Sequence, residues 1–63
     1  MMSNFIKLHD VETGNPVFIN MDTIEYMQDE VNYTEIMGIK HWSSHKVRER
    51  VDEIIKKIEL KGE

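Results

Sequence analysis

The three histidines are the side chains in this sequence that could supply metal ligation or acid–base chemistry near neutral pH. His41 and His45 are four residues apart, the spacing that places two zinc ligands on one face of a helix. We expect His41 in a strand and His45 in the first turn of a helix, so the helical geometry is lacking. We therefore predict solvent-exposed histidines and no metal site, and leave open a pairing of His9 with His41 across two strands.

Carboxylates are numerous, and two of them facing a cleft would be able to act as general acid and base. The sequence has twelve Asp and Glu residues, but their spacing singles out no pair. Asp52 and Glu53 each precede a lysine by four residues, which favours ion pairs on the exposed face of a helix. Cysteine is absent, and there is no Gly-rich phosphate loop or Gly-flanked serine turn. We therefore expect no enzyme, no catalytic residue and no cofactor.

The length of 63 residues allows one small domain, for which we expect an ordered core over about residues 4–60. A hydrophobic content of 40% and a charged content of 32% are ordinary for a folded domain. A chain this short buries only about 60% of its unfolded surface, and small domains often depend on disulfides, metals or self-association. Because cysteine is absent, oligomerisation or a lean core remains. Together with the apolar sheet face described below, this favours a homo-oligomer, with any other protein partner unknown.

The charge balance bears on partners and on location. A formal net charge of −4 opposes non-specific attraction to nucleic acid or to anionic membranes. No apolar run approaches the roughly 18–20 residues of a membrane span, so we expect no membrane insertion. The start of the chain, at residues 1–4, lacks the basic and apolar regions of a signal peptide. We expect a cytoplasmic protein.

The sequence before residue 44 has the period-2 pattern of short strands. In residues 4–9, Ile6 and Leu8 share one face, as in a half-buried strand. Polar turns are expected at residues 12–16 and 28–30, and the pattern leaves open which face of residues 31–37 is buried. Further strands are predicted over residues 17–19, 23–27, 31–37 and 39–42.

The apolar period becomes helical from Ser43 or Ser44, either of which is a plausible N-cap. The helix should end near Leu60, before Gly62. We predict an α+β fold, in which a small antiparallel β-meander of four to five short strands is followed by one C-terminal amphipathic helix packed on one sheet face. The predicted helical stripe has the spacing i, i+4, i+7, i+8 and i+11 and consists of Val47, Val51, Ile54, Ile55 and Ile58.

Two surfaces of this predicted fold are candidates for function. One helix covers one sheet face, so apolar side chains on the opposite face imply a partner. The predicted self-association face consists of Phe5, Phe18, Met27, Met37 and Trp42. The second surface is a basic edge of the predicted helix, formed by Lys46, Arg50, Lys57 and Lys61, which would be able to contact phosphates. The interpretation we favour for this edge is that long basic side chains cover the border of the apolar stripe with their methylene groups.

The order of these motifs resembles the FlbD-type family of small proteins, which is associated with bacterial flagella and swarming and has phage and prophage relatives. The resemblance covers residues 5–58 and is carried by residues 6–8, 14–20, 22–25 and 44–58. It implies a non-enzymatic accessory or regulatory protein without catalytic residues. The sequence departs from the family at Met37-Gly38, where the family commonly has Asn-Gly or Asp-Gly, and at Ser43-Ser44, where the family has Glu-Ser.

A rival resemblance implies a different function. Residues 17–24 followed by 44–50 are similar to the latter part of LytTR-type DNA-binding domains, in which the start of the last helix contacts DNA. A weaker likeness, of architecture alone, is to small dimeric RNA regulators of the CsrA type. The alternative prediction is therefore a small nucleic-acid-binding regulator. With the basic edge included, its predicted contacts are Ser44, His45, Lys46, Arg48, Arg50 and Lys57.

Overall fold

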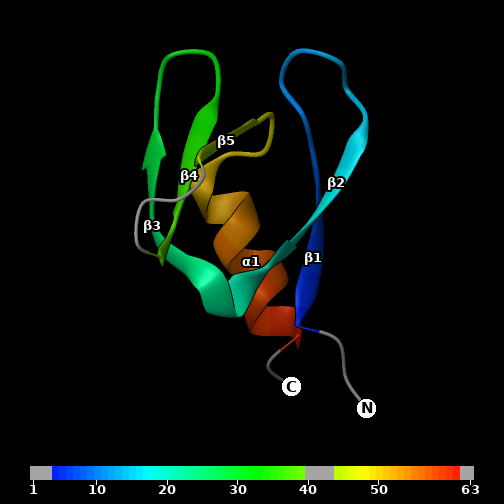
Figure 1. Ribbon diagram of the computed structural model, residues 1–63, viewed down its shortest axis with the longest axis vertical. Helices are drawn as coiled ribbons and strands as arrows, with labels where there is room; N and C mark the ends of the chain where they lie inside the picture. Colours follow the sequence, from blue (N-terminus) through cyan, green and yellow to red (C-terminus); the bar gives the residue numbers. More distant parts are fainter. Residues whose placement is uncertain (1–3, 40–43, 62–63) are drawn as a thin grey trace.

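The structure, a computed structural model, describes residues 4–39 and 44–61, and it places strands first and the helix last (Figure 1). This arrangement confirms the α+β class with a C-terminal helix. The strands are β1 (Phe5–His9), β2 (Pro16–Asn20), β3 (Ile24–Asp29), β4 (Thr34–Gly38) and β5 (Ser44–Val47). A short 3-10 turn, η1 (Met21–Thr23), joins β2 to β3, and the helix is α1 (Val51–Lys61).

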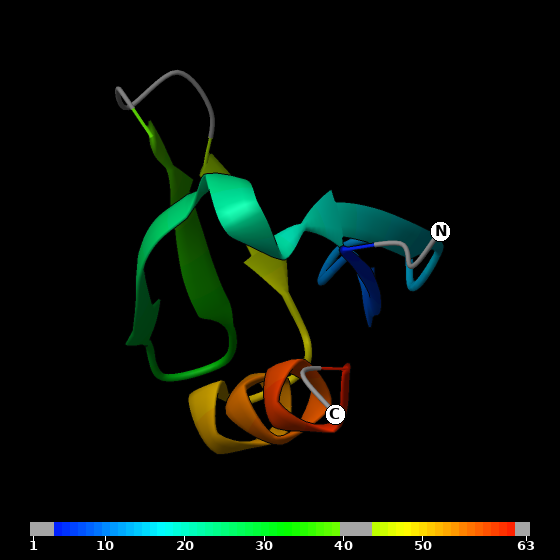
Figure 2. The same ribbon diagram turned by 90° about the horizontal axis from the view of Figure 1, so that it is seen from below.

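The strands form two antiparallel sheets, β1-β2 and β3-β4-β5. The sheets meet where the end of β1 approaches β5, through an isolated bridge between Asp10 and Val47. Next to the bridge, the Arg48 N–H donates to the His9 carbonyl at 2.9 Å. Hydrogen bonds thus connect the strands in the order β2-β1-β5-β4-β3, and the two sheets diverge above the helix (Figures 1 and 2). In this order β2 and β3 are the border strands.

The turn between β1 and β2 is organised by the Asp10 carboxylate. Its Oδ2 accepts hydrogen bonds from the N–H groups of Glu12 and Thr13 at 3.0 and 2.9 Å. The N–H of Thr13 contributes most to lowering the pKa of Asp10. Gly14 follows with a φ of 77°, a conformation that glycine adopts without steric cost. These contacts explain why the polar residues predicted as a turn reverse the chain here.

The core lies between the inner faces of the two sheets and the helix. Ile6 and Leu8 are both buried, which confirms the alternation predicted for the first strand. Ile55 is 43% exposed and lies outside the buried stripe of the helix. The buried hydrophobic side chains among the described residues are Ile6, Leu8, Ile36, Val47 and Ile54. The half-buried side chains packed against them are Val17, Ile19, Met21, Ile24, Met27 and Ile58.

The predicted start of the helix at Ser43 or Ser44 is wrong. Residues 44–47 form β5, which pairs antiparallel with β4, with Val47 opposite Thr34. Val47 lies four positions before Val51, so a buried strand residue has helical spacing by coincidence. The predicted strand over 39–42 is not found at Ile39, which lies outside the strands, and residues 40–42 are outside the described residues.

The second hairpin also differs from its predicted limits. β3 runs on to Asp29, so the turn covers residues 30–33, where the Glu30 N–H donates to the Tyr33 carbonyl at 2.7 Å. β4 buries Thr34 and Ile36. The structure thus settles which face of this strand is inside.

Candidate functional site

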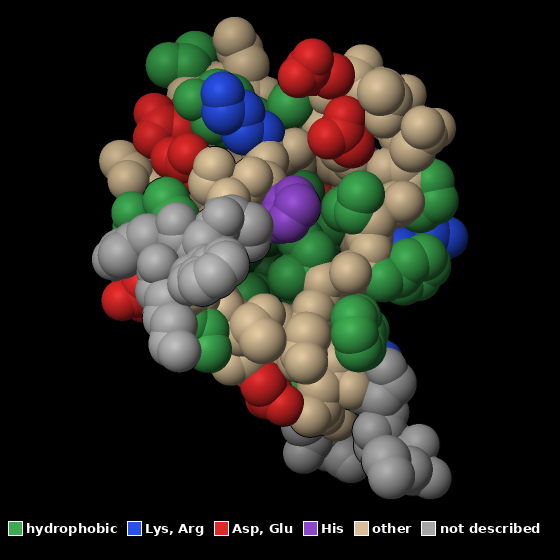
Figure 3. Space-filling view, viewed as in Figure 1, with side chains coloured by type: hydrophobic (Ala, Val, Ile, Leu, Met, Phe, Trp, Pro, Cys, Tyr) green, Lys and Arg blue, Asp and Glu red, His purple; other side chains and the backbone are tan. Residues whose placement is uncertain are grey.

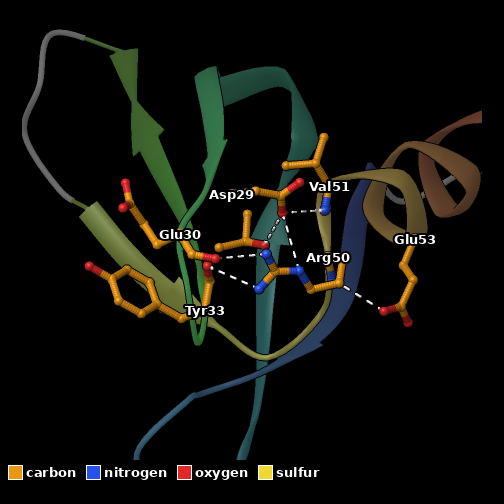
Figure 4. A network of polar contacts seen from close by, with 7 residues as sticks. Asp29, Glu30, Tyr33, Arg50, Val51 and Glu53 are labelled. Atoms are coloured by element: carbon orange, nitrogen blue, oxygen red, sulfur yellow. Dashed lines mark hydrogen bonds and ion pairs between the residues drawn. The ribbon is translucent and has the colours of Figure 1, made fainter.

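The most connected polar group lies where the helix begins (Figure 4). Asp29 Oδ1 accepts hydrogen bonds from the Val51 N–H at 3.1 Å and from the Thr34 hydroxyl at 3.0 Å. A carboxylate at this position satisfies an unpaired N–H of the first helical turn and interacts favourably with the helix dipole. At the same turn, Glu53 Oε1 accepts from the Arg50 N–H at 3.2 Å, as in one half of a capping box. The helix is therefore capped by a residue 22 positions away in sequence.

The Arg50 side chain fastens the β3–β4 turn to the helix start. Its Nη2 donates to the Glu30 carbonyl at 2.7 Å, and its Nη1 donates to the Tyr33 carbonyl at 3.3 Å (Figure 4). Its Nε lies 3.4 Å from Asp29 Oδ1. Because the guanidinium already binds these oxygens, Arg50 holds the fold together at the position where the sequence predicted a phosphate contact.

Glu49 links the first strand to the segment before the helix. Its Oε1 accepts from the His9 N–H at 2.9 Å, and its Oε2 lies 2.6 Å from His9 Nδ1. The carboxylate is almost fully buried. Burial opposes its ionisation, but the hydrogen bonds from the His9 side chain and N–H outweigh this and lower the pKa of Glu49. The sequence analysis missed this pair, because nothing in a local pattern relates residues 40 positions apart.

The residues predicted to contact nucleic acid do not form one helical edge. Ser44, His45 and Lys46 lie exposed on β5, and Arg50 precedes α1, so the predicted edge is wrong in its geometry. Lys57 lies half-buried on α1.

Two of the basic side chains on or beside β5 have neighbours of their own. The Arg48 guanidinium lies against Gly14, where an added Cβ would be only 3.1 Å from Nη1. Lys46 Nζ lies 5.1 Å from the centroid of the Tyr33 ring, within the range of a cation–π contact. Arg48 therefore packs on the β1–β2 turn, and Lys46 is the cation that has an aromatic neighbour.

The structure brings together only part of the predicted self-association face. Phe18 lies opposite Lys7 in the β1-β2 ladder, on the same outer face as Phe5. Met27 packs against the core instead, because its partner in the ladder is the buried Ile36. Met37 lies on the outer face of the other sheet, opposite Tyr26. Trp42 is outside the described residues.

A hollow of about 160 Å³ lies between β2 on one side and β4 and β5 on the other. Ile19, Ile24 and Ile36 are among the residues that line it, together with His45. His45 pairs with Ile36 in the ladder, so its side chain is on the inner face of the sheet. In the space-filling view, a histidine lies beside a hollow with hydrophobic side chains at its floor (Figure 3). His45 thus lies at the hollow, on the inner face of the sheet, and is not part of the predicted basic edge.

The described residues bear on two kinds of site, a metal site and a membrane-spanning helix. Residues 4–39 and 44–61 contain no group of three or more His, Asp or Glu side chains that could hold a metal ion. His9 contacts Glu49, and His41 lies outside the described residues, so the pairing of these two histidines that the sequence left open lies outside them too. Within the described residues, no helix has the length and apolar character needed to cross a membrane.

The polar side chains described above contact other groups of the same chain, and the β1-β2 hairpin has aromatic side chains on its outer face. β1 and β2 contain no Asp or Glu, although the whole chain carries a formal net charge of −4. Phe18, at the centre of β2, is 60% exposed. This chain matches no family model, no curated protein and no solved structure.

Proposed function

We propose that the chain is a non-enzymatic accessory or regulatory protein that acts through protein–protein contacts and self-association. The observation that carries this proposal is the outer face of the β1-β2 hairpin, where Phe18 is 60% exposed and neither strand has a carboxylate. Exposed aromatic side chains on a surface without carboxylates are typical of contact sites between proteins. The proposed role therefore depends on a surface rather than on an enclosed site.

The size of the core supports self-association. Among the described residues, only five hydrophobic side chains are buried. A small core leaves a single copy with a low free energy of unfolding, since domains of this length rarely gain more than about 3–5 kcal/mol from one core. Binding of a second copy to the folded state would raise that free energy by mass action.

The order of short strands followed by one helix supports a role of the FlbD type, in a flagellar or a phage or prophage context. Both departures from the family pattern remain. α1 begins at Val51, directly after Glu49-Arg50, so an arginine stands where the family has the serine of Glu-Ser. The other departure is Met37-Gly38, with Gly38 at the end of β4.

Light scattering on the full chain at a series of concentrations tests the proposal. We expect a mass that rises with concentration to at least twice the 7.5 kDa of one copy. A mass of one copy at every concentration up to the millimolar range would refute self-association.

Nucleic-acid binding is the second candidate, and the contact between Lys46 and Tyr33 is the observation that favours it. Sites for single-stranded nucleic acid combine basic side chains, which contact phosphates, with aromatic rings, on which bases stack; here Lys46 on β5 and Tyr33 in the β3–β4 turn supply one of each. We expect Lys46→Glu to abolish a salt-sensitive gel shift and the control Lys56→Glu, on the exposed side of α1, to preserve it. Absence of any shift with RNA or DNA at low salt would exclude this candidate.

A further inference from the structure

The hydrogen bonds of the first hairpin determine which backbone groups of β2 point away from β1. At one end of the ladder the Asp10 N–H donates to the Asn15 carbonyl, and at the other the Met21 N–H donates to the Asn4 carbonyl, each at 2.9 Å. Both bonds fit the register of the strands between them. Directly opposed residues of an antiparallel pair alternate between bonded and non-bonded. In β2 the odd-numbered residues therefore bond to β1, and the even-numbered residues turn their backbone groups outward.

The outward groups belong to Pro16, Phe18 and Asn20. Proline has no N–H, so Pro16 offers only a carbonyl. The carbonyl of Asn20 is already in use, because it accepts a hydrogen bond from the Thr23 hydroxyl at 2.8 Å. Phe18 offers both an N–H and a carbonyl. Among residues 4–39 and 44–61, no strand pairs with this edge of β2, whose residues Phe18 and Asn20 line the open hollow between β2 and the strands β4 and β5.

This edge is complementary to itself. In an antiparallel pairing of two β2 strands about Phe18, each Phe18 donates to and accepts from the Phe18 of the partner copy. The Asn20 N–H then lies opposite the carbonyl of the partner copy's Pro16. Pro16 of the partner copy has no N–H to donate to the Asn20 carbonyl opposite it. That carbonyl already accepts a hydrogen bond from the Thr23 hydroxyl of its own copy. The register centred on Phe18 therefore leaves no backbone group of this edge without a partner.

Charge also favours this edge over the other border strand. Two copies of a chain with a net charge of −4 repel each other, and the repulsion is least where no carboxylates approach. β2 has no charged residue. β3 carries Glu25 and Asp29, and its ladder has a register shift between Ile24 and Tyr26. Charges, bulges and prolines are features that protect edge strands from pairing. β2 has no charge and no bulge, and its one proline, Pro16, is the first residue of the strand.

We propose that two copies of this chain associate by antiparallel pairing of their β2 strands about Phe18, which makes a continuous sheet in the order β1-β2-β2-β1. The pairing rests on the proposed self-association and specifies the strand, the register and the partner, a second copy. It places the two Phe18 side chains next to each other on the outer face, between the two copies of Lys7.

Cross-linking tests the register directly, because the natural chain has no cysteine. In the proposed pair the two copies of residue 18 face each other with Cα atoms about 5.5 Å apart, a separation that a short thiol-reactive cross-linker bridges. We expect Phe18→Cys to form a covalent dimer with a short bis-maleimide reagent. The matched controls are Tyr26→Cys on the β3 edge and Val31→Cys in the β3–β4 turn, and neither should cross-link above background. Preferential cross-linking of Tyr26→Cys, or equal cross-linking of all three, would overturn the proposal.

Charge insertion provides the second test. Phe18→Glu would place two carboxylates next to each other in the dimer, so we expect at least a tenfold weaker association by light scattering. Val31→Glu adds the same charge at a side chain that is 91% exposed, and it should leave the association unchanged. Both variants should keep the circular dichroism of the natural chain, because both positions lie outside the core.

The outcomes separate this inference from the proposed function. A natural chain that is monomeric at all concentrations refutes both. A chain that associates equally well with Phe18→Glu, and does not cross-link through residue 18, refutes the β2 pairing and leaves self-association standing.

Discussion

Replacing Asp29 with alanine tests whether the helix depends on a cap supplied by another strand. Loss of an N-cap acceptor costs about 1 kcal/mol of the free energy of unfolding. The Thr34 hydroxyl is fully buried and donates to the same oxygen, and leaving such a group unpaired costs about 1–3 kcal/mol. The ion pair with Arg50 adds at most about 1 kcal/mol, because both side chains are about 40% exposed. We therefore expect Asp29→Ala to lower the free energy of unfolding by about 2–5 kcal/mol.

Urea unfolding followed by circular dichroism measures this free energy, at low temperature if the natural chain is marginally stable. Asp29→Asn retains an acceptor for both hydrogen bonds, so it should cost about 1 kcal/mol or less. Glu12→Ala removes an exposed carboxylate from the β1–β2 turn and should cost less than about 0.5 kcal/mol. The effect of Thr34→Val should be smaller in Asp29→Ala than in the natural chain, since the hydrogen bond is already lost. Equal effects of the alanine and asparagine substitutions would refute the capping argument.

Three further predictions concern the core, the first turn and the pH dependence. Ile54→Ala should cost about 2–5 kcal/mol in urea unfolding because the side chain is fully buried, whereas Ile55→Ala, at a half-exposed position, should cost less than about 1 kcal/mol. Gly14→Ala should cost about 1 kcal/mol because its φ is 77° and the Arg48 guanidinium lies only 3.1 Å from where the Cβ would be; an unchanged midpoint would contradict this. The pKa of Glu49 is lowered in the folded state, so the ionised carboxylate stabilises the fold fully above its ordinary pKa of 4.5. This stabilisation is lost as the pH falls through the folded-state pKa. We therefore expect Glu49→Gln, which retains an acceptor for His9, to flatten the loss of thermal stability between pH 5 and about pH 3, and an equally steep loss would show that other carboxylates dominate.

The first four strands, the α+β class and the C-terminal helix were predictable because the patterns that specify them are local. Ile6 and Leu8 alternate with polar neighbours, and Ile54 and Ile58 have helical spacing. The helix start was not predictable from the same evidence. Val47 continues the helical spacing backwards although it belongs to a strand, and serines before it imitate a cap.

The polar contacts of the site could not be predicted, because they join residues that are distant in sequence. The cap of α1 comes from Asp29, and the residue at the usual cap position, Arg50, has a side chain that can only donate. The positive charge of Arg50 suggested a phosphate contact. The groups that accept hydrogen bonds from Arg50 are instead backbone carbonyls of a turn, 17 and 20 residues earlier in the chain. The outward position of Phe18 follows from alternation once the register is known, but the sequence pattern of a three-residue apolar run did not specify it.

The strand order β2-β1-β5-β4-β3 has a consequence for how the chain is made. β1 is synthesised first, but its neighbour β5 is separated from it by about 35 residues, which take a ribosome roughly 2–7 s at about 5–20 residues per second. A β-hairpin forms in about 1–10 μs and is at best marginally stable alone. For seconds, therefore, the nascent β1-β2 hairpin has neither β5 nor α1 to cover Ile6 and Leu8. Folding of this unit must wait until β5 and α1 have emerged, and during that interval a folded copy nearby would offer the hairpin its first partner.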